Sequence, residues 1–510
     1  MKIKATILTL LIPAFYCHGQ KRPAVISSQF TAVEKRVDQA LKKKVIPSMV
    51  IAVSKDGKII YQEAFGYADV NKKIKATIHT PYQLASATKP FTATAIMMLA
   101  ERGLINIDSP ITKYVPGLVL KKANPHFSTP TVRQVLNHTS GLGTYFDMGY
   151  ADERYSFDNF DKGWERYGTI FFEPGTVCEY SNLGYGVLAR VIAKVSGKTY
   201  RDFVSSELLQ PLHLKDTYVA IPAHLRKGSA KKYNPDGVEF PEVTNNTEGA
   251  GNIYSSVNDL IRFGMFHLGE KNDGRYILSS PLARLMQNYV DKKTLYPIDQ
   301  DTFYGLGWYN KTEPDSSTTV WHEGGMPGAS SMLKLFPKDH IAIAIITNSY
   351  DYPFCREITE DLEKTIFPNR NFSPINEMAG YQYYTNDTTL TGTWKGNITV
   401  EGKPIQATLS IDKKEIVFDY ADQTLKSFLT ENQPLPHKTV LLYGMSNKDY
   451  FLGTTTGILP ASHLRRELSH LLILKLLRRG KNLTGFGTIM AAANREYYAY
   501  PFFVDLKKQE

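Results

Sequence analysis

The sequence predicts an α+β protein in two parts. The first is an antiparallel sheet flanked by helices and joined to an all-helical lobe, and the second is a small antiparallel β-barrel or sandwich. Strand-like runs lie at both ends of residues 28–368 and enclose a helical middle, which indicates one large mixed domain. Residues 369–390 are rich in Pro, Asn, Thr and Tyr and are expected to form a linker. In residues 391–510, short apolar runs alternate with polar residues, as in a half-buried sheet.

The first strands are expected at 48–54 and 58–65, on either side of Asp56-Gly57. An Asp-Gly step favours the positive backbone angles of a tight turn, so these two strands are predicted to form a hairpin.

The helical middle is expected to begin at Thr88, where apolar residues start to recur at helical spacing, and Gly103 is placed to end that helix. The same reasoning predicts helices at 131–136, 184–195 and 352–365, and strands at 304–308, 330–336 and 341–347.

In the C-terminal part, residues 393–400 and 407–411 alternate as strands do. Two apolar runs within 470–491 flank the turn-forming residues 479–482, which indicates a hairpin. An amphipathic helix at 462–477 is an alternative that periodicity alone leaves open.

Residues 1–19 have the features of an export signal: a positively charged start and an apolar run at 5–16. That run is shorter than the ~20 residues that cross a bilayer. Acylation of Cys17 would give a lipid anchor instead, but the bulky Tyr16 before it disfavours that reading. We expect an exported protein, periplasmic or secreted, with no membrane span.

The chain of 510 residues has a formal net charge of +10, and part of it lies near the C-terminus, at 465–481, where basic residues alternate with apolar ones as on a solvated face. No nucleic-acid partner is therefore expected. After the signal only Cys178 and Cys355 remain, too few for a disulfide framework, and free thiols are favoured over a pair. The sequence contains no obvious metal-binding cluster or phosphate-binding loop, so no cofactor is expected. The oligomeric state stays open.

The first chemical motif is Ser86-Ala87-Thr88-Lys89. At the start of a helix, positions i and i+3 share a face, which places the lysine beside the hydroxyl. A serine hydroxyl becomes a good nucleophile when a neighbour accepts its proton. The same pattern recurs from Ser229, Ser331 and Ser410, but in loop-like or strand-like segments where the two side chains do not meet.

The second motif is Tyr180-Ser181-Asn182. In an extended loop, side chains two apart share a face, so the phenol and the amide are expected to point into one cleft. A charged Lys89 would stabilise a phenolate at Tyr180. Asn182 is able to donate to a substrate carbonyl and to accept from Lys89.

The third motif is His322-Glu323-Gly324-Gly325. Glycines at a strand edge let a substrate backbone approach closely and offer an N–H group to an oxyanion. His322 would supply a hydrogen-bond donor that is partly charged near neutral pH. The aromatic residues between 145 and 172 either rim the same pocket or pack in the helical lobe.

In this order, the three motifs resemble the penicillin-recognising serine hydrolases, in the branch of class C β-lactamases, D-alanyl-D-alanine carboxypeptidases, D-aminopeptidases and esterases. The longest single match is 131–142, Thr-Val-Arg-Gln-Val-Leu-Asn-His-Thr-Ser-Gly-Leu, and the likeness covers about residues 30–365. The resemblance implies a β-lactamase/transpeptidase-like fold for residues 28–368. It also implies that Ser86 attacks a carbonyl and becomes acylated, while Lys89 and Tyr180 move the proton.

For the binding side, the resemblance implies that Asn182, His322 and Gly324 contact the substrate and that the N–H groups of Ser86 and Gly325 hold the oxyanion. The chain has no K-T-G or K-S-G, and His322 stands where class C β-lactamases have a lysine. A substrate carboxylate would then be bound less well, and its KM would rise from about pH 6 to pH 8 as His322 loses its charge.

The departure favours hydrolysis of an amide or ester, in a D-amino-acid peptide or a small ester, over a genuine β-lactamase. A rival of another class is a penicillin-binding sensor or scaffold that acylates slowly or not at all. The intact Ser86, Lys89, Tyr180 and Asn182 argue against that rival.

Overall fold

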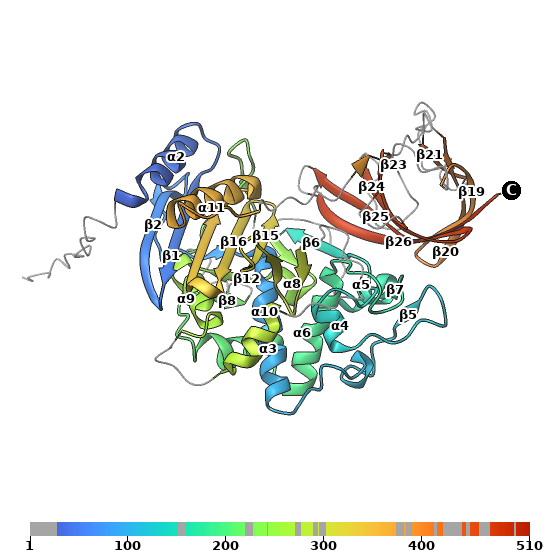
Figure 1. Cartoon of the computed structure of the whole chain (residues 1–510), viewed down its shortest axis with the longest axis horizontal. Coiled ribbons are helices and arrows are strands. Elements are labelled where there is room, and N and C mark those ends of the chain that lie inside the picture. The colour runs from blue at the N-terminus through green and yellow to red at the C-terminus, as the bar shows by residue number, and fades with distance from the viewer. Residues whose placement is uncertain are drawn as a thin grey trace, which may run out of the picture.

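The computed structural model describes residues 28–150, 160–219, 228–241, 243–270, 277–288, 294, 302–373, 382–383, 390–412, 416–421, 441–444, 449–457, 470–493 and 496–509. The expected signal at 1–19, with Cys17, and most of the expected linker lie outside these residues. Two large antiparallel sheets lie side by side, and the helical lobe packs below them in the view of Figure 1. The α+β fold class is confirmed, and no described helix is both long and apolar enough to cross a bilayer.

The first sheet joins strands from both ends of the large domain, as expected. Its eight strands follow the order β13 (Thr302–Tyr304), β14 (Tyr309–Thr312), β15 (Thr318–Met326), β16 (Ala329–Phe336), β17 (Ile341–Thr347), β1 (Ser48–Lys55), β2 (Lys58–Asp69) and β3 (Ile74–Lys75). Asp56 and Gly57 have φ values of 49° and 71°, which confirms the hairpin turn between β1 and β2.

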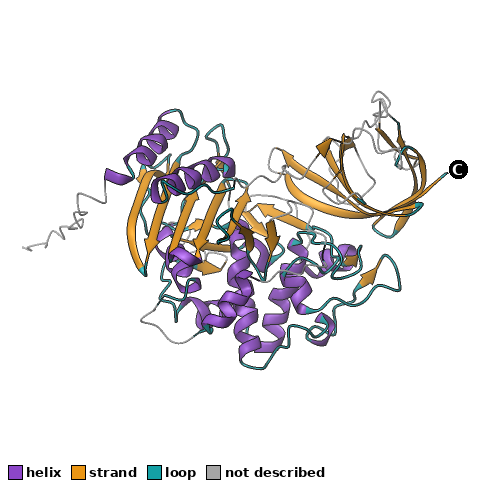
Figure 2. Ribbon diagram, viewed as in Figure 1, coloured by secondary structure: helices purple, strands orange, loops and turns teal. Residues whose placement is uncertain are grey.

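Helices cover both faces of this sheet. Successive side chains of its central strands point to opposite faces, so both sets are buried. From β1, Met49, Ile51 and Val53 pack with helices α2 and α11, while Val50 and Ala52 pack with the helical lobe. Figure 2 shows the helices on the two sides of the sheet. The helices are α2 (Thr31–Lys42), α3 (Lys89–Glu101), α4 (Val132–Leu136), α5 (Phe160–Tyr167), α6 (Asn182–Ser196), α7 (Tyr200–Phe203), α8 (Glu248–Gly251), α9 (Val257–His267), α10 (Ser280–Asn288) and α11 (Tyr352–Ile366).

Short elements complete the large domain. They are the 3₁₀ turns Ala85–Thr88, Ile111–Lys113 and Pro337–Asp339, the π-helical turn Val204–Leu209, and the strands β4 (Tyr82–Gln83), β5 (Lys121–Lys122), β7 (Thr169–Ile170), β8 (Tyr218–Val219), β9 (Lys232–Tyr233), β10 (Glu239–Phe240) and β12 (Ile253–Ser255).

The second sheet is a curled antiparallel sheet, which agrees with the barrel-like domain expected at 391–510 (Figure 1). Its strands follow the order β18 (Gln382–Tyr383), β22 (Leu441–Gly444), β23 (Tyr450–Gly457), β24 (His470–Arg479), β25 (Asn482–Ala493), β26 (Glu496–Lys508), β19 (Gly392–Val400), β20 (Lys403–Ile411) and β21 (Ile416–Ala421). The hairpin through residues 479–482 is confirmed, because Arg479 pairs with Asn482.

Two predictions about these elements are wrong. Residues 304–308 are no strand: β13 ends at Tyr304 and β14 begins at Tyr309, with Gly307 between them at a φ of 92° that only glycine adopts easily. The alternative helix at 462–477 also fails, since its described residues from 470 onward belong to β24.

The second sheet is attached to the helical lobe by backbone pairing and by aromatic stacking. Strand β26 pairs with β6 (Phe146–Tyr150), which in turn pairs with β11 (Val243–Asn245). Tyr500 stacks on Tyr167 at 5.2 Å, and the Tyr167 hydroxyl donates to Glu401 Oε1 at 2.9 Å. Tyr145 and Trp164 are buried as well, so aromatic residues of 145–172 pack in the lobe and against this sheet.

Candidate active site

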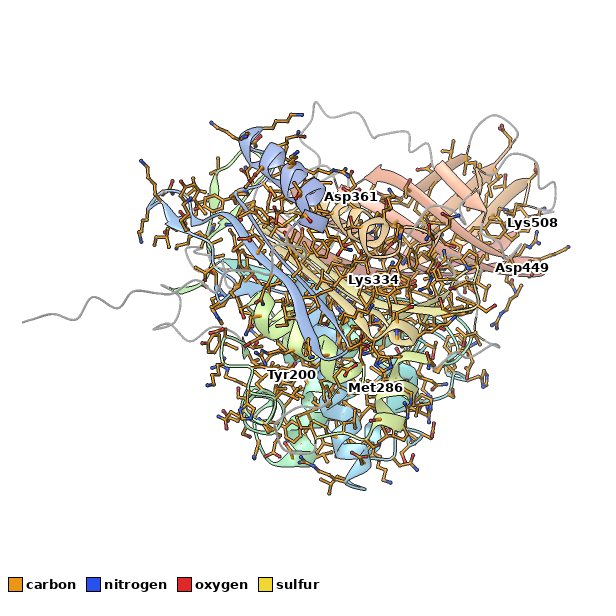
Figure 3. All side chains as sticks on the ribbon, turned by 60° about the vertical axis from the view of Figure 1, so that its left-hand side comes forward. Tyr200, Met286, Lys334, Asp361, Asp449 and Lys508 are labelled. Atoms are coloured by element: carbon orange, nitrogen blue, oxygen red, sulfur yellow. The ribbon has the colours of Figure 1, made fainter. Side chains whose placement is uncertain are left out.

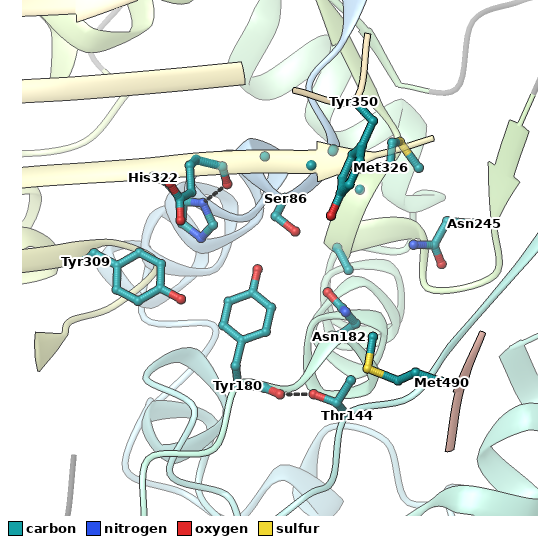
Figure 4. A pocket seen from close by; sticks show the side chains of 16 residues that line it. Ser86, Thr144, Tyr180, Asn182, Asn245, Tyr309, His322, Met326, Tyr350 and Met490 are labelled. Atoms are coloured by element: carbon teal, nitrogen blue, oxygen red, sulfur yellow. Dashed lines mark hydrogen bonds between the residues drawn. The ribbon is translucent and has the colours of Figure 1, made fainter. Parts of the chain in front are cut away.

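A cavity of about 410 Å³ opens between the end of β15 and the helical lobe (Figure 4). Residues from both sheets and from the lobe line it: Ala85, Ser86, Thr144, Tyr180, Asn182, Asn245, Ala250, Gly251, Tyr309, His322, Glu323, Gly324, Gly325, Met326, Tyr350 and Met490. The residues expected to carry chemistry all line this cavity except Lys89, whose Nζ lies 3.1 Å from Ser86 Oγ.

Ser86 lies on the 3₁₀ turn that leads into α3. Ala85, just before it, has a φ of 48°, a left-handed conformation that costs energy for a residue with a Cβ. The turn is held by its surroundings. The Ser331 hydroxyl donates to Leu84 O at 2.7 Å, and the Leu84 N–H donates to Ile253 O at 2.8 Å. Strained backbone that its neighbours fix in this way is common at reactive residues.

Lys89 is fully buried, and its Nζ has three partners: Ser86 Oγ at 3.1 Å, Asn182 Oδ1 at 2.7 Å and Ala250 O at 3.1 Å. Burial holds the pKa of Lys89 well below that of an ordinary lysine, which favours the neutral amine. This lowering works against the cationic Lys89 that a phenolate at Tyr180 would need.

A neutral amine has two N–H donors and one lone pair. Asn182 Oδ1 and the Ala250 carbonyl oxygen only accept hydrogen bonds, so they take both N–H groups of Lys89. In the neutral form the lone pair would face Ser86, whose hydroxyl would donate to Nζ, whereas the charged form donates to Ser86 Oγ. This arrangement prepares Ser86 to lose its proton to Lys89.

Tyr180 and Asn182 flank the N-terminus of α6, where Ser181 caps the helix by accepting from the Gly184 N–H. The Thr144 hydroxyl donates to the Tyr180 carbonyl, and the Ser181 N–H donates to His138 Nδ1 at 3.1 Å. The Tyr180 ring lies 4.6 Å from Lys89 Nζ, and its hydroxyl points toward Ser86 (Figure 4).

His138 supports this loop by accepting the hydrogen bond from Ser181. Its imidazole is buried against the rings of Tyr180 and Tyr304, each at 4.4 Å. Burial lowers the pKa of His138, so the ring stays neutral.

His322 does not behave as expected. Its Nδ1 lies 2.7 Å from the Glu323 carbonyl oxygen and must donate to it, so Nε2 accepts from the Tyr304 hydroxyl at 2.9 Å. Both ring nitrogens are thus in use, and burial lowers the pKa of His322 to about 3. The prediction of a partly charged donor is wrong, so this ring is not expected to raise KM between pH 6 and 8.

Gly324 and Gly325 lie at the end of β15. A Cβ on Gly324 would lie 2.0 Å from Leu84 O, so the strand packs directly on the turn that carries Ser86. The sequence predicted that these glycines would let a substrate backbone approach closely. At Gly324 the backbone that approaches closely is the protein's own, at Leu84. Gly325, one residue further along the strand, lines the cavity, as Ser86 does.

The lining is electrically neutral among the described residues. Glu323 is its one carboxylate, and Arg356 binds it at 2.6 and 2.9 Å. None of the described lining side chains is a lysine or an arginine.

Several lining residues were missed from the sequence: Thr144, Asn245, Tyr309, Tyr350 and Met490. Tyr309 lies within residues 30–365, where the sequence resembles the family, so a comparison with family members could have identified it. Met490 lies on β25 of the second sheet and packs near Ala85 and Met326, a contact that no sequence pattern indicates.

The other predicted features lie elsewhere. In the S-x-x-K pattern of Ser331, Lys334, which is labelled in Figure 3, is buried at 2% exposure. It pairs with Glu363 of α11 at 2.5 Å. Cys178 and Cys355 are free, and burial raises the pKa of both thiols. Among the described residues, no group of His, Cys, Asp or Glu is arranged to hold a metal ion.

Comparison with known proteins agrees with this geometry. The sequence model of the Beta-lactamase family matches residues 33–364. The chain is 26% identical over 353 residues to Protein flp of Staphylococcus aureus (strain COL), with 68% of each chain covered.

Two solved structures share the fold. SurE with D-Leu has a TM-score of 0.61 at 18% identity and covers 95% of this chain and 100% of its own, so its match includes the second sheet. The D-amino acid amidase from Ochrobactrum anthropi SV3, complexed with L-phenylalanine, has a TM-score of 0.55 at 23% identity over 67% of this chain and 99% of its own. The protein is a serine hydrolase with a β-lactamase/transpeptidase-like fold. It belongs to the Beta-lactamase family, which confirms the resemblance drawn from the motifs.

Proposed function

We propose that Ser86 is the nucleophile of an acyl-enzyme reaction on small, uncharged esters or amides. The observation that supports this most is the 3.1 Å contact between Lys89 Nζ and Ser86 Oγ, because burial lowers the pKa of Lys89 and so favours the neutral amine, the form that accepts a proton. Ser86 Oγ attacks the substrate carbonyl while its proton moves to Lys89 Nζ. The N–H groups of Ser86 and Gly325 stabilise the oxyanion.

The proton then passes through the Tyr180 hydroxyl to the leaving group, which departs as an alcohol or amine. Water attacks the acyl-enzyme in the second half of the reaction and returns the proton to Ser86. Asn182 Oδ1 is occupied by Lys89, which leaves its amide N–H groups to donate to the acyl side of the substrate.

The neutral lining favours an uncharged substrate over one that carries a carboxylate, as β-lactams and D-alanyl-D-alanine peptides do. A small ester fits best. An amide of a D-amino acid is the second candidate, favoured by the likeness to SurE with D-Leu and to a D-amino acid amidase. Export, to the periplasm or beyond, is part of the proposal and rests on residues 1–19.

Intact-protein mass spectrometry tests the nucleophile. Wild type and Ser86→Ala are incubated with a fluorophosphonate and, separately, with a penicillin. We expect one fluorophosphonate adduct that maps to Ser86 and is absent from the variant. A penicillin adduct that never decays would instead support the penicillin-binding sensor, and labelling that survives in Ser86→Ala would refute the proposal.

A further inference from the structure

The residue next to Tyr180 is a buried carboxylate. Glu179 is only 2% exposed, and its backbone N–H donates to His138 O at 2.7 Å. Burial raises the pKa of this carboxyl, because removing a charge from water is costly. An ionised Glu179 therefore needs a cation close by.

That cation comes from the second sheet. Lys475 of β24 places its Nζ 2.5 Å from Glu179 Oε1, and it counteracts part of the rise in the carboxyl's pKa. The lysine is itself three-quarters buried. It lies 5.7 Å from the centre of the Phe486 ring, which packs on Phe171 and Phe172 of the lobe. The pair thus lies within the contact between the sheet and the lobe.

The same loop carries the proposed proton carrier. Tyr180 follows Glu179 directly, and its ring packs on His138, the residue whose carbonyl accepts from Glu179. If Glu179 were charged and unpaired, it would be driven toward water and would pull Tyr180 with it. Cys178, which also lies near this carboxylate, has a thiol pKa raised by burial and stays neutral.

We propose that Lys475 is a positioning residue for Tyr180: by pairing with Glu179, the second sheet holds the phenol in place above Ser86 and Lys89. The inference rests on the proposed function. It makes the C-terminal domain part of the catalytic machinery, although Lys475 touches no substrate.

The test compares Lys475→Met, Lys475→Arg, Glu179→Gln and the double variant Glu179→Gln/Lys475→Met in the full-length protein, with p-nitrophenyl butyrate as substrate. We expect kcat of Lys475→Met to fall by about 10- to 100-fold, as a displacement on the order of 1 Å would cause, with KM changed less than about threefold. Lys475→Arg retains activity. The double variant recovers most of it, because a neutral glutamine needs no cation.

The pH profile adds a readout that simple loss of packing would not move. Without Lys475 the pKa of Glu179 rises further, so the carboxyl is neutral at low pH and charged at high pH. The activity of Lys475→Met relative to wild type should therefore decrease as pH rises from about 6 to about 9.

Arg478→Met is the matched control, since Arg478 lies on the same strand and pairs with the exposed Asp449 of its own domain. It should leave kcat and the pH profile unchanged. Lys475→Met with wild-type kcat at pH 8 would overturn the inference. A loss that neither varies with pH nor is rescued by Glu179→Gln would overturn it too. Failure of the proposed function is separate, because it would show as absent labelling of Ser86 in wild type.

Discussion

Substitution of Gly324 by alanine probes the contact that brings the third motif to the nucleophile. The new methyl carbon would lie 2.0 Å from Leu84 O, 2.6 Å from Ser331 Oγ and 3.1 Å from Ala87 N. Unstrained carbon–oxygen contacts are about 3.3 Å or longer, so β15 and the turn must separate by about 1.3 Å. The hydrogen bond from Ser331 to Leu84 O would then be lost or stretched.

Overpacking of this kind costs about 1–3 kcal/mol of stability. A shift on the order of 1 Å between the nucleophile and Gly325 should lower kcat/KM by about 10²-fold. The assay is hydrolysis of p-nitrophenyl butyrate, together with urea unfolding of the same samples.

Gly117→Ala is the matched control, since nothing lies within 4 Å of a Cβ at Gly117. That variant should match wild type in both measurements. If Gly324→Ala also keeps wild-type kcat/KM and its unfolding midpoint, the close packing of strand on turn is not what holds the site together.

Three further predictions follow from buried groups. Lys89→Met should abolish fluorophosphonate labelling, or slow it by about 10²- to 10⁴-fold, with the fold intact by circular dichroism. The pKa values of His322 and His267 are held to about 3 by burial, against about 6.5 in an unfolded chain, so the unfolded state binds protons first as pH falls. In urea titrations, these rings should not affect the free energy of unfolding above about pH 6.5. Between about pH 6 and 4, each ring should lower that free energy by about 1.4 kcal/mol per pH unit. KM should stay flat from pH 6 to 8. Lys334→Met should lower the free energy of unfolding by about 3–5 kcal/mol, because it leaves the buried carboxylate of Glu363 without its cation. The double variant Lys334→Met/Glu363→Gln should recover most of that loss. An unchanged unfolding midpoint in the single variant would contradict this prediction.

Much of the site was predictable because local spacing determines it. Ser86 and Lys89 share a helical face, and Tyr180 and Asn182 flank a capped helix N-terminus, so short motifs sufficed to find them. The expected strand at 304–308 failed because apolar alternation hides a turn, which depends on the positive φ of Gly307.

The charge states were beyond the sequence because burial sets them. The lowered pKa values of Lys89 and His322 follow from the burial of both side chains in the folded protein. From the second sheet, Met490 lines the cavity and Lys475 pairs with Glu179, the residue before Tyr180. Only the folded arrangement of the two parts brings them there.

The central claim is that Lys89 is neutral at working pH and accepts the proton of Ser86. The most direct measurement is the rate of fluorophosphonate labelling of Ser86 as a function of pH. A lysine of ordinary pKa would be almost fully protonated at pH 8, and the labelling rate would rise about tenfold from pH 8 to pH 9. Because burial lowers the pKa of Lys89, we expect a rise well below tenfold over that interval. A tenfold rise, absent from Lys89→Met, would show that Lys89 is charged at neutral pH and would contradict the account.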